Sequence, residues 1–172
     1  MTRASCTFDG PCSIRYPKSA VSLPEGYAIP TFTIGKWLTL REGTDAVMLA
    51  VGSMVSTALR VADALAQDGI SLAVVNASTV KPLDSDCLHQ AFSMGKPVFT
   101  LEEHVRMAGF GSAVLEAASE MGFQPRVKLL AVDDCFVPHG DHAHLLRDTG
   151  LDDESVMRAI ITELNREEPK NV

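Results

Sequence analysis

Apolar residues form short continuous runs along most of the chain, and these runs alternate with segments in which apolar residues recur at helical spacing. The runs at 46–51, 70–75, 97–101 and 127–132 predict strands that are covered on both faces. Helical spacing begins at Val55 and ends before Gly69, which suits the residue after a helix. Further helices are predicted to begin near Asp84 and Gly109, and to span 141–148 and 152–164.

A further strand is predicted within 31–40, where β-branched and aromatic residues precede the turn Arg41-Glu42-Gly43. This tight turn predicts that the strand is an antiparallel neighbour of the run at 46–51. The alternation of strands and helices predicts a mostly parallel sheet. The expected fold is therefore a three-layer α/β/α domain with about five strands, mostly parallel with one antiparallel edge strand.

The first thirty residues break this pattern. Residues 13–16 read as a short strand, and residues 18–30 are rich in Pro, Gly, Ser and Ala without periodicity. A strand followed by a linker suggests the end of another domain. We therefore divide the chain into residues 1–17, a linker at 18–30, and the α/β domain at 31–172.

Composition narrows the class of protein. The chain has 172 residues and a net charge of −7, which disfavours a nucleic-acid binder. Its longest apolar run is too short to span a membrane, and no signal peptide is recognisable. Four cysteines lie far apart at positions 6, 12, 87 and 135, so we expect free thiols in a reducing cytoplasm and no zinc or other metal site.

Three loops at the expected carboxyl ends of strands could carry chemistry. Gly52-Ser53 precedes a helix and could hold an anion, although a simple turn is favoured. Glu102, Glu103 and His104 could form a general base, hold a loop or face a partner domain, and the sequence leaves these alternatives open. The segment 133–140 combines Asp, Cys and His, but its Pro and Gly residues favour a structural loop.

Arg15 and Lys18 flank Tyr16-Pro17. Two cations around a bend fixed by proline can converge on one phosphate. From spacing alone, two solvated surface charges are the favoured interpretation.

Several segments together resemble the 1-deoxy-D-xylulose-5-phosphate synthase family, thiamine-diphosphate transferases related to transketolase. One group, at 9–11 and 14–18, is similar to the end of its pyrimidine-binding domain. The others are similar to its C-terminal domain, in matching order and spacing, at 80–84, 102–104, 109–114, 136–140 and 146–152. The resemblance implies that residues 1–17 hold the last strand of the preceding domain and that 31–172 form a transketolase C-terminal-like domain.

The resemblance also implies an activity. The family condenses pyruvate with glyceraldehyde 3-phosphate, releases carbon dioxide and supplies isoprenoid, thiamine and pyridoxal synthesis. Thiamine diphosphate, Mg²⁺ and a homodimer are implied for the complete enzyme. The cofactor motif and the activating Glu belong to domains that this chain does not resemble, so the chain alone is expected to be inactive, to hold no catalytic residue, and to need the remaining domains as partners.

Two groups of residues carry over from the family. Arg15 and Lys18 match a basic pair at the pocket for the acceptor phosphate, with Lys18 in place of the usual Arg, which loses the bidentate fork. For Glu102, Glu103 and His104 we expect an interdomain position or one that faces the active site, and no role in proton transfer. The alternatives are a subunit of a split transketolase, a 2-oxo-acid dehydrogenase β-subunit, or a non-catalytic module that binds a small anion or a partner. We also expect an exposed apolar or mixed patch that packs against another domain or subunit.

Overall fold

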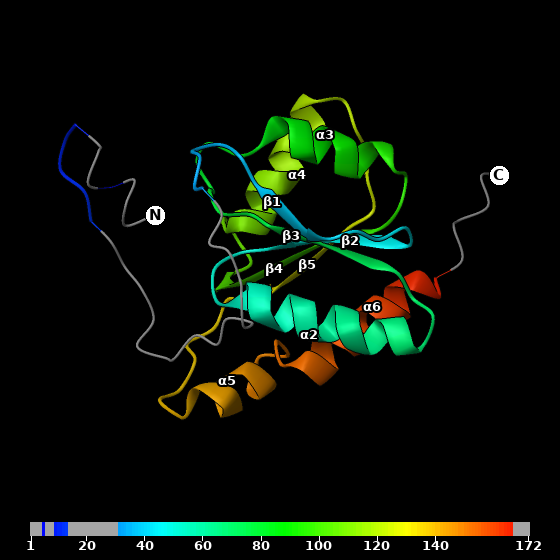
Figure 1. The fold of residues 1–172 in the computed structure, drawn as a ribbon. Coiled ribbons are helices and arrows are strands. Elements are labelled where there is room, and N and C mark those ends of the chain that lie inside the picture. Colours follow the sequence, from blue (N-terminus) through cyan, green and yellow to red (C-terminus); the bar gives the residue numbers. More distant parts are fainter. Residues whose placement is uncertain (1–4, 6–8, 14–30, 167–172) are drawn as a thin grey trace.

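The computed structural model describes residue 5, residues 9–13 and residues 31–166. A five-stranded sheet lies at the centre, in the order β1-β3-β2-β4-β5 (Figure 1). Its strands are β1 (Leu38–Arg41), β2 (Ala46–Ala50), β3 (Leu72–Asn76), β4 (Val98–Val105) and β5 (Val127–Val132). Strand β1 is antiparallel to its neighbour, whereas β2 to β5 are parallel. This confirms the predicted fold class.

Helices cover both faces of the sheet, in three layers (Figure 1). They are α2 (Met54–Gln67), α3 (Ser85–Ser93), α4 (Phe110–Glu120), α5 (His142–Asp148) and α6 (Asp153–Leu164). One core lies between the sheet and helices α2 and α6, and the other lies between the sheet and helices α3 and α4.

Strand β2 explains why the apolar runs are continuous. Ala46, Met48 and Ala50 enter the core beneath α2, while Val47 and Leu49 enter the core beneath α3 and α4. All five residues of β2 are buried, so a polar side chain without a hydrogen-bond partner would be costly at any position of this strand.

The predicted position of the antiparallel strand was wrong. Strand β1 pairs with β3, not with β2. The turn after β1 crosses the amino end of β3, where the backbone N–H groups of Thr44 and Asp45 donate to Ser71 O at 3.1 and 2.9 Å. A Cβ atom on Gly43 would lie 2.1 Å from Ala73 N, so only glycine allows this crossing.

The strand begins only at Leu38, later than predicted within 31–40, because the backbone just ahead of it is bonded elsewhere. The Trp37 N–H donates to the Asp84 carboxylate at 2.8 Å instead of to a neighbouring strand. Gly35, with φ of +75°, turns the chain just before this contact. We call residues 33–37 the strap.

Most of the residues expected to begin helices do so. Asp84 caps α3 by accepting from Cys87 N, and Asp141 caps α5 by accepting from Ala143 N. Asp152 precedes α6 without a side-chain cap hydrogen bond. Within the described ranges, no helix is long and apolar enough to cross a membrane.

Two sequence interpretations concern residues that the structure does not describe. Arg15 and Lys18 lie outside the described residues. So do the linker expected at 18–30 and, except for its first residue, the strand expected at 13–16.

Candidate functional site at the carboxyl edge of the sheet

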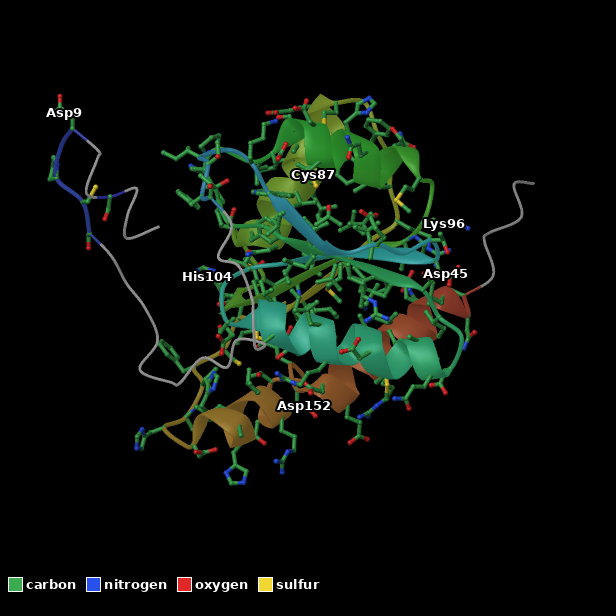
Figure 2. The ribbon with its side chains drawn as sticks, in the orientation of Figure 1. Asp9, Asp45, Cys87, Lys96, His104 and Asp152 are labelled. Carbon is green, nitrogen blue, oxygen red and sulfur yellow. The ribbon has the colours of Figure 1, made fainter. Side chains whose placement is uncertain are left out.

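The parallel strands β2 to β5 all end at one edge of the sheet, which we call the carboxyl edge. The strap reaches the same edge, because Leu38 at the start of antiparallel β1 pairs with Asn76 at the end of β3. Figure 2 labels His104 at this edge, with Asp45 and Lys96 at the opposite edge. The predicted group at 102–104 therefore lies where open α/β sheets place their functional residues.

Glu102 lies within β4, which extends further than the predicted 97–101. Its side chain is buried, and its two carboxylate oxygens accept from Phe110 N at 2.7 Å and from Gly111 N at 2.8 Å. The first turn of a helix leaves its N–H groups without partners inside the helix, and the helix dipole there also favours a negative charge. Glu102 therefore fixes the end of β4 to the start of α4.

Two glycines leave room for this contact. A Cβ atom on Gly109 would lie 2.7 Å from a Glu102 oxygen and 2.5 Å from Val105 O. A Cβ atom on Gly111 would lie 2.7 Å from both Thr100 Oγ1 and Leu129 Cδ2. The small residues in the matching segment 109–114 thus allow helix α4 to approach the sheet closely.

Glu103 connects three loops. One of its oxygens accepts a hydrogen bond from the Ser53 hydroxyl, ahead of α2, and the other contacts the His142 ring at the start of α5. The Glu103 side chain is 31% exposed and that of His142 is 60% exposed. The carboxylate lies between the hydroxyl and the imidazole and holds both in place. This order differs from a Ser-His-Asp triad, in which the imidazole lies between the hydroxyl and the carboxylate.

The sequence did not predict this grouping. The sequence places Ser53 and the segment 102–104 after predicted strands, but His142 is 39 residues from Glu103 and lies in a different predicted segment, at the start of the helix at 141–148. No local pattern indicates the contact. The order of strands, with β2 beside β4, is what brings these residues together.

His104 lies apart from this grouping. Its side chain is exposed, and its Nδ1 lies 3.1 Å from Val105 O. Because the Glu102 carboxylate is bonded to the backbone of α4, the two residues do not form the paired acid and base considered from the sequence.

The segment 133–140 is an exposed loop. Asp133 forms an ion pair with Arg106 at 2.8 Å, and Cys135 N donates to Asp133 O at 2.7 Å. These contacts tie the loops after β4 and β5 together. In the described part of the chain, no three His, Cys, Asp or Glu side chains are placed to share a metal ion.

The strap is fixed at the end of the carboxyl edge that lies near β1. Besides its backbone contact with Asp84, Trp37 donates from its indole Nε1 to Thr79 O at 2.8 Å, and its ring meets Phe110 edge-on at 5.7 Å. Lys36 lies 3.5 Å from the Asp84 carboxylate. Burial pushes the pKa of Asp84 upward, but hydrogen bonds from the Trp37 and Cys87 backbone, with the Lys36 charge, outweigh it and lower the pKa below 3.8.

The described residues do not fit a thiamine-diphosphate site. A diphosphate needs unpaired N–H donors or cations, usually with a metal held by carboxylates. The N–H groups at the start of α4 are occupied by Glu102, and Ser53 ahead of α2 is bonded to Glu103. We therefore derive no catalytic step through that cofactor from these residues.

The sequence model for the transketolase C-terminal domain matches residues 35–156. The chain belongs to the transketolase C-terminal domain family. This assignment agrees with the resemblance noted at segments between residues 80 and 152.

Curated relatives narrow the match within the transketolase C-terminal family. A 1-deoxy-D-xylulose-5-phosphate synthase from Thermus thermophilus is 43% identical over 161 residues, covering 93% of this chain and 25% of the relative. Those from Pelotomaculum thermopropionicum and Geobacillus thermodenitrificans are 40% and 38% identical, covering 100% and 94% of this chain. The chain spans about a quarter of the length of these relatives.

Solved structures agree at the level of fold. A split-gene transketolase, described as an inactive β4 tetramer, matches with a TM-score of 0.73 and 33% identity, over 85% of this chain and 47% of that chain. A transketolase from Pichia stipitis matches with a TM-score of 0.58 at 18% identity, over 76% of this chain and 18% of that chain. The second match supports the fold alone.

Proposed function

We propose that this chain is the C-terminal portion of a 1-deoxy-D-xylulose-5-phosphate synthase. The complete enzyme would condense pyruvate with glyceraldehyde 3-phosphate to 1-deoxy-D-xylulose 5-phosphate and carbon dioxide. The observation that carries this proposal is the 38–43% identity to synthases over nearly the whole chain, although each match covers about a quarter of the relative.

The catalytic machinery would belong to the other domains. Those domains would hold thiamine diphosphate together with Mg²⁺, and the bound cofactor would supply the chemistry that joins the two substrates. The carboxylates at the carboxyl edge are committed to the chain's own backbone and loops. We propose that the chain alone is inactive, and that the complete enzyme is a cytoplasmic homodimer.

Reconstitution tests this proposal. The purified chain is mixed with the remaining part of the Thermus thermophilus relative, from which the matching quarter has been removed. With thiamine diphosphate, Mg²⁺, pyruvate and glyceraldehyde 3-phosphate, we expect the mixture to form 1-deoxyxylulose 5-phosphate and neither part alone to form it. Product from the chain alone, or no product from the mixture, would contradict the proposal.

A split transketolase is the second candidate, favoured by the likeness to the split-gene structure at a TM-score of 0.73. Because the catalytic machinery would lie in the remaining part, the test is repeated with the remaining part of the split-gene transketolase in place of that of the synthase. A transketolase subunit would support transfer of a two-carbon unit from a ketose phosphate to an aldose phosphate, without release of carbon dioxide from pyruvate.

We further propose that Arg15 and Lys18 bind the phosphate of the acceptor. Each cation would contribute a charge-assisted hydrogen bond of about 1.5–3 kcal/mol. In the reconstituted enzyme, Lys18→Ala should therefore raise the KM for glyceraldehyde 3-phosphate roughly tenfold to a hundredfold, at about 1.4 kcal/mol per tenfold. The KM for pyruvate, which has no phosphate, should barely change. Equal changes for both substrates would instead indicate a structural role for Lys18.

A further inference from the structure

Exposed apolar side chains concentrate at the carboxyl edge. Seven large apolar residues are exposed in the described part of the chain, and five of them lie at this edge. Phe136 is fully exposed and Met107 is 66% exposed. The five are Ile34 in the strap, Val80 after β3, Met107 after β4, and Phe136 and Val137 after β5. Five of seven exposed apolar residues on one edge of the sheet favour an interaction site there, because randomly scattered ones would be spread over the whole surface.

The charged groups of the same edge are largely paired within the domain. Glu102 binds the backbone of α4, Glu103 contacts His142, and Arg106 pairs with Asp133. Covering such paired groups costs less than covering isolated charges, because each keeps its partner when water is removed. An apolar centre bordered by paired polar groups is the usual composition of a protein–protein interface.

The polypeptide also enters the domain at this edge. The strap is held by Asp84 and Thr79 directly before β1 begins at Leu38. Whatever part of the enzyme is joined ahead of residue 31 is therefore tethered at the carboxyl edge, next to Ile34 and on the same edge as Met107, Phe136 and Val137. Such a tether raises the effective concentration of the joined part and favours docking close to the point of attachment.

We propose that the carboxyl edge is the docking face of this domain, and that its occupant is the domain of the same enzyme joined to the chain ahead of residue 31. This inference rests on the proposed function, which supplies that domain. In the docked enzyme, Met107, Phe136 and Val137 lie at the centre of the contact. Glu102 and Glu103 act indirectly, by holding the loops that carry these side chains.

Two methionines provide a matched test. Met107 is at the carboxyl edge, whereas Met94 is 41% exposed at the end of α3, ahead of β4 and therefore at the opposite edge. The affinity of the full chain for the remaining part of the Thermus thermophilus relative is measured by isothermal titration calorimetry for wild type, Met107→Asp, Met94→Asp and Phe136→Asp. Because all three side chains are exposed, circular dichroism and urea unfolding should show that each variant folds.

We expect Met107→Asp and Phe136→Asp each to weaken binding at least tenfold, and Met94→Asp to change it less than twofold. Equal affinities for all variants, with wild type binding, would overturn the docking face and leave the proposed function standing. A wild-type chain that does not bind the remaining part would contradict both. If Met107→Asp abolishes only self-association of the chain, measured by sedimentation equilibrium, the occupant is a second copy and the proposal is wrong.

Discussion

Glu102 and Glu103 are adjacent in the sequence but differ in what they hold. The first is buried and binds the backbone N–H groups of α4, whereas the second is partly exposed and joins two side chains. A buried donor that loses its acceptor is costly, while a partly exposed one is satisfied by water. The two residues should therefore contribute very differently to stability.

We expect Glu102→Gln to lower the free energy of unfolding by about 2–3 kcal/mol, because one buried N–H of α4 then faces the amide NH₂ group instead of an oxygen. Urea unfolding followed by circular dichroism measures this loss. The matched variant Glu103→Gln should cost less than about 1 kcal/mol, as is usual for a partly exposed polar contact. Equal losses would mean that the contact with α4 is not what stabilises this edge.

Cys87 should be the least reactive of the described cysteines. Burial, followed by the nearby Asp84 carboxylate, raises the pKa of its thiol to about 11, whereas Cys12 and Cys135 are exposed. At pH 8 only about one Cys87 thiol in a thousand is then ionised, and the thiolate is the reactive form. Iodoacetamide labelling followed by mass spectrometry should modify Cys135 at least tenfold faster. Comparable rates that persist while the domain remains folded would contradict this assignment.

At the scale of elements, the sequence predicts most strands and helices because each core strand carries its own signal. The five buried residues of β2 leave an apolar run that needs no partner to be recognised. No sequence signal of this kind indicates which strand β1 pairs with. This pairing depends on Gly43 and on the backbone hydrogen bonds to Ser71 O, and a tight turn normally joins adjacent strands.

The candidate site also has a part that the sequence predicts and a part that it does not. Its location at 102–104 can be predicted, because the ends of parallel strands share one edge. Its contacts cannot, because the Glu103 oxygens meet Ser53 and His142, 50 and 39 residues away. Sequence spacing also gives no sign that Glu102 faces the backbone of α4 rather than its neighbour His104.

Helix α4 depends on its close approach to the sheet. A Cβ atom at Gly111 would overlap Thr100 Oγ1 and Leu129 Cδ2, both at 2.7 Å. We expect Gly111→Ala to lower the free energy of unfolding by roughly 1–3 kcal/mol, as overpacking usually does, despite the better helix propensity of alanine. Ser119→Ala, at an exposed position of the same helix, is the control and should change it by less than about 0.5 kcal/mol. A stabilising Gly111→Ala would show that the helix can move away from the sheet at no cost.

At the scale of the whole molecule, both cores lie within the described residues from 37 to 164. The strap adds contacts around Asp84 from residue 36 onward. A chain that begins at Leu23 keeps all of these interactions. We expect it to unfold in a single cooperative transition in urea, with a midpoint close to that of the full chain. A gradual transition, with a cooperative one for the full chain, would place the domain boundary before Leu23.

Trp37 is the only tryptophan of the chain. Its indole nitrogen donates to Thr79 O, and its ring lies edge-on to Phe110 at the start of α4. Indole emission shifts to longer wavelength when water reaches the ring, so the molecule carries its own fluorophore where the strap, α3 and α4 meet. The emission of Trp37 therefore reports whether the strap is bound to the domain. This emission can change while the helical circular dichroism signal stays constant. The polypeptide that enters the domain can thus be followed optically without a label.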